Sequence, residues 1–163
     1  MIRRIKVPDD RIAVLIGRSG KTRRYLENKT KTKITIEDDV QIEGEALDVI
    51  VAENIAKAIS RGFSPKNAFA LLHEDTTMAI IDLPKNADKL KRIRSRLIGT
   101  KGKCRRTLEV LTKTKISIYG RTVGIIGSYE SIELAEDAIN RLITGISHKN
   151  VYAYLEGRKS NIS

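Results

Sequence analysis

The segment LIGRSGKTRRYLENKTKTKI, residues 15–34, occurs a second time as LIGTKGKCRRTLEVLTKTKI, residues 97–116. The two segments align without gaps at an offset of 82 residues; six positions differ, so 14 of the 20 are identical. Both contain Leu-Ile-Gly-x-x-Gly-Lys-x-Arg-Arg, and both end in Thr-Lys-Thr-Lys-Ile. Such a repeat indicates a duplication, so this chain of 163 residues is expected to form two small domains of about 70 to 80 residues each.

The Ser-Gly-Lys-Thr at residues 19–22 looks like the end of the phosphate-binding loop of nucleotide hydrolases. That loop has the spacing G-x-x-x-x-G-K-[ST], and its first glycine would fall at position 15, which is Leu15. Without that glycine the loop is too short to surround a triphosphate with backbone N–H groups. ATP binding at this loop is therefore not expected.

The composition indicates an anionic partner. The chain carries 31 Lys and Arg against 20 Asp and Glu residues, a formal net charge of +11, which makes nucleic acid the first candidate. An excess of lysine that aids solubility is the alternative. The single cysteine, Cys104, excludes an internal disulfide and a Cys-based zinc site and fits a cytoplasmic location. The segment MIRRIKVPDD is too charged for a signal peptide, and no stretch approaches 18 apolar residues, so no membrane partner is expected.

Both copies are expected to have the same order of elements. Alternating apolar residues predict three strands in each copy, at residues 2–8, 33–38, 40–44, 77–83, 115–120 and 122–127. Helical spacing predicts three helices in each copy, at residues 11–17, 20–30, 46–62, 87–99, 103–113 and 128–145. Asp9 and Asp10 are candidates for the N-cap of the first helix. The order β-α-G-x-x-G-α-β-β-α predicts an α+β fold, a three-stranded sheet with three helices on one face.

The domain boundaries follow from these elements. We expect a first domain at residues 1–62 and a second at residues 77–146. Residues 63–76 are expected to be a linker, with a short helix that starts at Pro65. Residues 147–163 are expected to hold one more short helix and a frayed tail.

The Gly-x-x-Gly loops are candidate phosphate sites, because each is followed by a helix whose first turn presents free N–H groups and a positive dipole end. The glycines let a sugar-phosphate chain approach the backbone closely. The residues expected to bind a nucleic-acid strand are Ile16, Gly17, Arg18, Ser19, Gly20, Lys21, Arg23 and Arg24 in the first copy and Ile98, Gly99, Thr100, Lys101, Gly102, Lys103, Arg105, Arg106, Ile116 and Ile118 in the second.

Bases would need an apolar surface beside each loop. In the first copy, Leu15, Ile16, Ile34 and Ile36 are candidates for it, and the second copy repeats them. For each of these aliphatic residues a pure core role is equally compatible with the sequence. For the arginines, a solvated helix face is the alternative.

The two copies differ in charge. The first copy follows its second strand with Glu37, Asp38 and Asp39 and has Glu43 further on, whereas the second copy has Arg121 and no acid there. The helix before the second loop adds the cations Lys89, Lys91, Arg92, Arg94 and Arg96. Since acids repel a phosphate chain, we expect the second copy to be the stronger nucleic-acid site and the first copy to be a weaker one or a protein-docking site.

The element order, with Ile-Gly-x-x-Gly between two helices, resembles the type I KH domain over nearly the whole chain, twice. Residues 115–159 resemble archaeal members of the Dim or Partner-of-Nob family of KH-domain ribosome-assembly factors. The resemblance implies binding of single-stranded RNA near the 3′ end of small-subunit rRNA, at Gly99–Gly102. It implies the Nob endonuclease and the alpha subunit of translation initiation factor two as partners. The first loop motif, which eukaryotic members have lost, is intact here.

Other functions fit the same loops: a general regulator that binds single-stranded RNA or DNA, or an exosome-type RNA-binding subunit, which normally carries a barrel domain before its KH domain. His73 and His148 lie far apart, and Cys104 takes the place of Thr22 in the other copy, so neither a metal site nor a nucleophile is expected. Residues 37–39 could bind a divalent ion, although a polar hairpin turn explains them equally. We expect no cofactor and no enzymatic activity.

Overall fold

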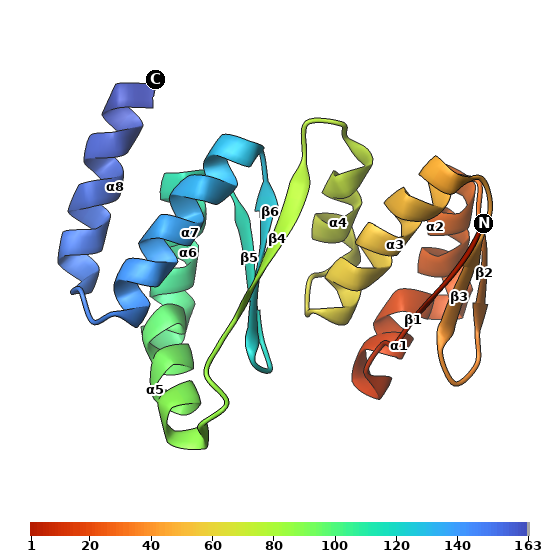
Figure 1. Cartoon of the computed structure of the whole chain (residues 1–163), viewed down its shortest axis with the longest axis horizontal. Helices are drawn as coiled ribbons and strands as arrows, with labels where there is room; N and C mark the ends of the chain where they lie inside the picture. The colour runs from red at the N-terminus through yellow and green to blue at the C-terminus, as the bar shows by residue number, and fades with distance from the viewer. Residues whose placement is uncertain (163) are drawn as a thin grey trace. The chain divides into compact units, whose positions relative to one another are not determined.

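The chain forms two compact units. The computed structural model describes the backbone of residues 1–162 and the side chains of residues 1–158. The internal contacts divide it into Met1–Glu74 and Asp75–Ser163. Each unit holds one copy of the repeat, so the duplication seen in the sequence corresponds to two folded bodies (Figure 1).

The first unit has the predicted order of elements. It contains β1 (Ile2–Ile5), α1 (Asp9–Ile16), the 3-10 turn η1 (Arg18–Gly20), α2 (Lys21–Thr30), β2 (Lys33–Ile36), β3 (Val40–Glu43) and α3 (Ala46–Ser60). A short helix α4 (Pro65–Ala68) and the 3-10 turn η2 (Phe69–Leu72) follow. Pro65 stands at the start of α4, and the Ser64 hydroxyl accepts a hydrogen bond from the Asn67 N–H at 3.2 Å, which explains why a helix begins there.

The second unit repeats this order and adds a helix. It contains β4 (Thr77–Asp82), α5 (Ala87–Ile98), the 3-10 turn η3 (Thr100–Gly102), α6 (Lys103–Thr112), β5 (Lys115–Tyr119), β6 (Thr122–Gly127), α7 (Tyr129–Ile143) and α8 (His148–Ile162). With 15 residues, α8 is longer than the short helix expected from the sequence. Val151 and Leu155, one turn apart, are fully buried in the core of this unit, so packing extends the helix.

Each unit contains one antiparallel three-stranded sheet, with the strand orders β1-β3-β2 and β4-β6-β5. In the first sheet Ile34 pairs with Ile42 and Ile36 with Val40, so these side chains share one face. Ile34, Val40 and Ile42 are buried, and Figure 1 shows the helices of the unit on one side of the sheet. This arrangement confirms the α+β fold with helices on one sheet face.

The first helix begins differently from the prediction. Pro8, not Asp9 or Asp10, occupies the N-cap position of α1, and no side chain caps this helix. The two aspartates lie in the first turn, where their charges favour the positive end of the helix dipole. The N-cap prediction was therefore wrong by one position, because Pro8 can hold the extended backbone of a cap without a side-chain hydrogen bond.

The Thr-Lys-Thr that closes both repeats has a structural role. Lys113 ends α6 in the left-handed region at φ 56°, which turns the chain towards β5. The Thr112 hydroxyl donates to the Leu108 carbonyl at 2.7 Å and lies 2.8 Å from the Thr114 hydroxyl, both threonines being buried. Thr30, Lys31 and Thr32 reproduce this geometry in the first unit. The identity of the repeats here reflects folding rather than binding.

Over residues 1–162, no helix is both long and apolar enough to cross a membrane.

Candidate nucleic-acid interface

The two Gly-x-x-Gly loops have almost the same backbone. Gly17 has φ 75° and ψ 173°, and its counterpart Gly99 has φ 74° and ψ 176°. The last glycines, Gly20 and Gly102, both have φ 77°. In each loop the last glycine N–H donates to the carbonyl of the first, at 3.1 Å and 3.2 Å. The repeat therefore conserves the shape of the loop as well as its sequence.

The first glycine of each loop is required by space as well as by its dihedral angles. A Cβ atom on Gly99 would lie 2.7 Å from the Cys104 backbone nitrogen and 2.8 Å from the Cys104 Cβ. On Gly17 it would meet the side chain of Thr22 and lie 2.8 Å from the Thr22 nitrogen. The preceding helix therefore meets the following helix at a distance that only glycine permits.

The helix after each loop starts without a side-chain cap. Gly20 and Gly102 occupy the N-cap positions of α2 and α6, and glycine has no side chain to accept from the first-turn N–H groups. The positive dipole end is thus open to an external anion. The site therefore fits an anion with acceptor oxygens, such as a phosphate.

Some predicted cations are exposed beside the loops and available to a ligand. They are Arg18, Lys21 and Arg24 in the first unit and Lys101, Lys103 and Arg106 in the second. Ser19 and Thr100, the remaining loop positions, are also exposed.

Arg106 also supports the second loop directly. Its Nη1 donates to the Lys101 carbonyl at 2.6 Å, although Lys101 is held at φ 54°, in the left-handed region. The guanidinium therefore joins α6 to the loop while it remains exposed. Arg24 lies in the same place in the first unit, since a Cβ on Gly20 would come within 2.8 Å of its Nη1.

Arg23 and Arg105 are only half-exposed and are engaged within their own units. The Arg105 Nη1 lies 2.9 Å from Glu109 Oε1, and Glu109 Oε2 accepts from the Ile116 N–H at 2.8 Å. In the first unit Arg23 pairs with Glu27 at 3.8 Å, and Glu27 Oε2 accepts a hydrogen bond from the Ile34 N–H of β2 at 2.9 Å. Each arginine therefore pairs with a glutamate whose carboxylate also bonds the strand that follows the helix. The i,i+4 spacing of each pair was visible in the sequence and would have indicated this role.

The aliphatic residues divide into two groups. Leu15, Leu97, Ile34 and Ile116 are at most 5% exposed and belong to the cores. Half-buried positions beside each loop and on the following strand are the remaining candidates for a base surface, and they are Ile16, Ile36, Ile98 and Ile118.

Two of the extra cations of the second unit are also partly engaged in the fold. Arg96 Nε donates to the Leu142 carbonyl at 2.9 Å, and its Nη2 reaches the Ile146 carbonyl, which satisfies the end of α7. Arg94 Nη1 donates to the Gly120 carbonyl at 2.9 Å. Lys89, Lys91 and Arg92 are exposed. The excess of available cations before the second loop is thus smaller than the sequence indicated.

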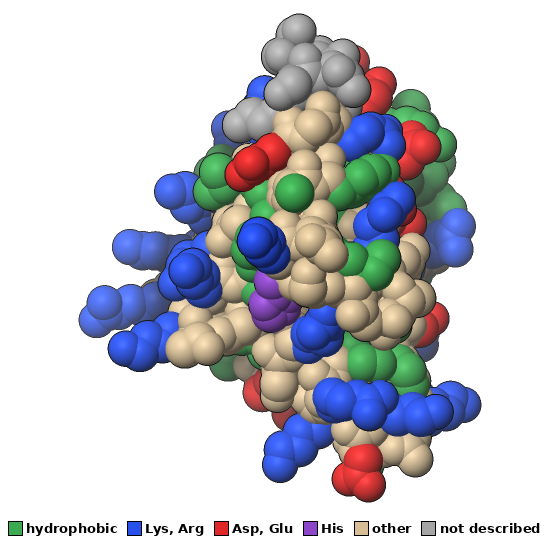
Figure 2. All heavy atoms as spheres, turned by 90° about the vertical axis from the view of Figure 1, so that its left-hand side faces the viewer, with side chains coloured by type: hydrophobic (Ala, Val, Ile, Leu, Met, Phe, Trp, Pro, Cys, Tyr) green, Lys and Arg blue, Asp and Glu red, His purple; other side chains and the backbone are tan. Residues whose placement is uncertain are grey.

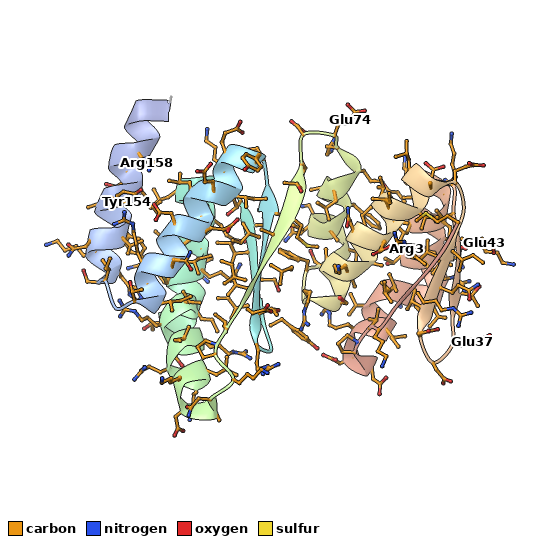
Figure 3. The ribbon with its side chains drawn as sticks, viewed as in Figure 1. Arg3, Glu37, Glu43, Glu74, Tyr154 and Arg158 are labelled. Atoms are coloured by element: carbon orange, nitrogen blue, oxygen red, sulfur yellow. The ribbon has the colours of Figure 1, made fainter. Side chains whose placement is uncertain are left out.

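The acids of the first unit are not gathered in one place. Glu37 and Asp38 are exposed at the turn between β2 and β3, and Glu43 lies at the other end of β3 (Figure 3). Glu43 pairs in register with Ile2 and Lys33, next to Ile42, so its side chain lies on the face away from the helices. The corresponding turn of the second unit carries Arg121 instead.

Cys104 and His148 are both engaged within the second unit. Burial raises the pKa of the Cys104 thiol, an effect that a hydrogen bond with Tyr152 and the charge of Arg96 only partly offset. The His148 Nε2 donates to the Arg96 carbonyl at 2.9 Å, while His73 is exposed. Among residues 1–158, no group of three or more His, Cys, Asp and Glu side chains is placed to hold a metal ion.

The families that match are consistent with this geometry. Residues 76–160 match the family model described as eukaryotic type KH-domain, KH-domain type I, and residues 2–58 match the model described as KH domain. A KH domain-containing protein of Methanocaldococcus jannaschii is 36% identical, over 97% of this chain and 74% of that protein. The RNA-binding protein pno1 of Dictyostelium discoideum is 30% identical, over 99% of this chain and 73% of that protein.

Two solved structures from Pyrococcus horikoshii are similar over nearly the whole chain. Dim2p is 44% identical with a TM-score of 0.89, over 96% of this chain and 98% of that one. A chain in the complex of a/eIF2alpha, aDim2p and rRNA is 44% identical with a TM-score of 0.91, over 99% of this chain and 95% of that one.

Proposed function

This chain belongs to the family of type I KH-domain proteins that includes Pno1 and archaeal Dim2p, and we propose that it binds single-stranded RNA through its Gly-x-x-Gly loops. One observation carries the proposal. Two loops with the same backbone each open an uncapped helix among exposed cations. Sugar-phosphate is the ligand that this arrangement fits, and KH domains use such a loop for about four nucleotides of single strand.

The RNA that we propose is the 3′ region of small-subunit rRNA, bound during assembly of the small ribosomal subunit. The similar chain from Pyrococcus horikoshii was solved in a complex with rRNA and a/eIF2alpha, which supports both rRNA and that factor as partners here. The family resemblance adds the Nob endonuclease as a further partner. Such partners support a cytoplasmic location.

We infer that the second loop is the stronger site. The turn between β5 and β6 carries Arg121, whereas the turn between β2 and β3 carries Glu37 and Asp38. The positive charge of Arg121 attracts a phosphate chain, and the two acids repel it. We also infer that the protein acts by binding and not by catalysis. Around the loops its groups are guanidinium, ammonium and backbone N–H donors, which hold phosphate without a general base.

Matched double substitutions test the proposal. Thr100→Asp with Lys101→Asp and Arg18→Asp with Ser19→Asp each change the net charge by −3. Lys101 and Ser19 have φ 54° and 56°, and Asp tolerates this region, so the fold is expected to survive both changes. We expect the second-loop variant to lose affinity for a single-stranded RNA from the small-subunit rRNA 3′ end by at least about tenfold more than the first-loop variant.

Fluorescence anisotropy of the labelled RNA measures both affinities, and circular dichroism checks that each variant is folded. Unchanged binding in both folded variants would exclude RNA binding through the loops. A greater loss in the first-loop variant would reverse the order of the two sites. Binding of an unrelated single strand as tightly as the rRNA sequence would favour a general RNA-binding role over rRNA.

A further inference from the structure

A groove lies beside the second loop, between α6 and α8. It has a volume of about 450 Å³, within the range typical of small-molecule sites. Its walls are largely apolar: Val110 and Leu111 come from α6, and Tyr152 comes from α8. Figure 1 shows α8 running alongside α6, so the groove depends on the helix that the second unit adds to the repeat.

Two cations lie at the end of this groove that is nearest to the loop. Lys103 and Arg106, in the first turn of α6, line it together with the apolar walls. Arg106 is the residue whose guanidinium bonds the Lys101 carbonyl of the loop. An RNA strand that continues from the loop would therefore bring its next phosphate to two positive charges at the edge of an apolar groove. Figure 2, which faces the α8 side, shows many more Lys and Arg than Asp and Glu side chains, with hydrophobic side chains between them.

Tyr152 directs its hydroxyl towards α6. Burial, followed by a hydrogen bond with Cys104 of α6, raises the pKa of this hydroxyl to about 12. The residue lines the groove, so its ring offers an aromatic surface on which a base could pack.

We propose that this groove is a further nucleotide subsite, in which the RNA strand held by the second loop continues across α6. One phosphate lies between Lys103 and Arg106, and the adjoining base packs against Tyr152, Val110 and Leu111. The inference rests on the proposed RNA binding and extends the path of the strand beyond the nucleotides that the loop holds. Both cations lie on α6, so the backbone follows the α6 edge, and Glu156 lines the α8 side of the groove.

The first unit fills the same place with its own side chains. Tyr25 occupies the position of Thr107 in the repeat, and its ring packs on Phe69 of η2 with 4.7 Å between the ring centroids. Lys29, at the position of Leu111, lies over the Tyr25 ring at 5.5 Å. An aromatic pair and a cation thus cover the face of α2 that corresponds to the groove. The subsite is therefore a property of the second unit.

A matched pair of substitutions tests the subsite. Val110→Glu places a carboxylate in the groove at a side chain that is 69% exposed, so the fold is expected to tolerate it. Asn28→Glu makes the same kind of change at the equivalent exposed position of α2. Affinities are measured by anisotropy for two single-stranded RNAs of about four and about eight nucleotides, the longer one extending the shorter in both directions.

We expect the full-length wild-type chain to bind the longer RNA more tightly, and Val110→Glu to remove about tenfold of that affinity while it leaves the shorter RNA within about twofold. Asn28→Glu should leave both affinities within about twofold. An equal loss for both RNAs, or no loss for the longer one, would overturn the subsite while RNA binding by the loop stands. If the wild-type chain bound neither RNA, the proposed function itself would fail.

A photo-crosslink gives an independent readout. With 4-thiouridine placed at each position of the longer RNA in turn, we expect a crosslink to the peptide that contains Tyr152 from a nucleotide outside the segment held by the loop. Crosslinks confined to residues of the loop and of β5 would contradict the proposal. Loss of a protein partner in Val110→Glu, with RNA binding and crosslinks unchanged, would contradict it as well.

Discussion

Substitution of the first glycine of the second loop by alanine should destabilise the second unit far more than substitution of the last glycine. Gly99 has φ 74° and ψ 176°, a combination almost confined to glycine. An alanine Cβ there would also lie 2.7 Å from the Cys104 backbone nitrogen, which cannot move without α6. Gly102 has φ 77° and ψ 13°, in the left-handed helical region, and its Cβ would meet only the flexible end of Arg106, at 3.0 Å.

The expected magnitudes follow from these two geometries. For Gly99→Ala, the backbone strain costs about 1–3 kcal/mol and the forced shift of α6 about 1–3 kcal/mol. The lower entropy of the unfolded chain offsets about 0.4–1 kcal/mol, so about 3 kcal/mol remains. For Gly102→Ala, the left-handed conformation costs about 1–2 kcal/mol with the same offset, which leaves about 1 kcal/mol.

Urea denaturation of the full chain, followed by circular dichroism, measures the free energy of unfolding, and hydrogen exchange with mass spectrometry assigns the change to residues 75–162. A difference of about 2 kcal/mol corresponds to roughly 10 °C in the melting temperature of a domain this size. Equal destabilisation by Gly99→Ala and Gly102→Ala would show that the close contact with Cys104 does not determine the cost. So would a cost for Gly99→Ala below about 1 kcal/mol, because the contact with Cys104 would then be relieved without strain.

Three further changes test the contacts around the site. Glu109→Ala removes the acceptor of the buried Ile116 N–H and should lower the free energy of unfolding by about 2 kcal/mol in urea denaturation, whereas Glu109→Gln, which keeps an acceptor, should cost less than half of that. Tyr154→Phe deletes the hydroxyl that donates to Asp137 at 2.5 Å and should cost about 1 kcal/mol by the same measurement. The folded-state pKa of Tyr152 is raised from 10.0 to about 12, so its contribution to stability is full below pH 10 and is lost as the pH rises towards 12. Tyr152→Phe should therefore flatten the decline of the unfolding free energy over this pH range relative to the wild type. An unchanged pH profile in this variant would contradict the raised pKa.

The contacts of Tyr154 also show how α8 is held to the rest of the second unit. The Tyr154 hydroxyl accepts from Arg158 Nη1 at 2.7 Å, and the Arg141 guanidinium lies 3.8 Å from the centre of the Tyr154 ring. Tyr154 and Arg158 both lie on α8, as labelled in Figure 3, while Arg141 and Asp137 belong to α7. These contacts add to the burial of Val151 and Leu155 in holding α8 to the unit.

The sequence predicted the loops well because local chemistry determines them. Gly17 ends α1 and Gly20 precedes α2 as expected, since the dihedral angles of Gly17 are almost confined to glycine and the left-handed conformation of Gly20 favours it, and the second copy repeats the pattern independently. The pairing of Arg105 with Glu109 is equally local, and its i,i+4 spacing is visible in the sequence, although Arg105 was predicted to bind RNA.

Other features depend on contacts between segments far apart in the chain. Arg96 bonds the Leu142 carbonyl, 46 residues away, and no local pattern distinguishes it from an arginine on a solvated helix face. The groove beside the second loop exists only because α8 docks against α6, and the sequence of residues 147–163 indicated a short helix without indicating its neighbour. Tertiary packing decides both features, so they could only be read from the structure.

Binding of single-stranded RNA by the second loop can be observed directly at its backbone amides. Titration of a short rRNA 3′-end oligonucleotide into ¹⁵N-labelled protein, followed by amide chemical shifts, tests it residue by residue. We expect the largest shifts at the amides of residues 99–106, smaller shifts at residues 17–24, and slight ones elsewhere on the two sheets. Saturable binding with no shift at residues 99–106 would contradict it.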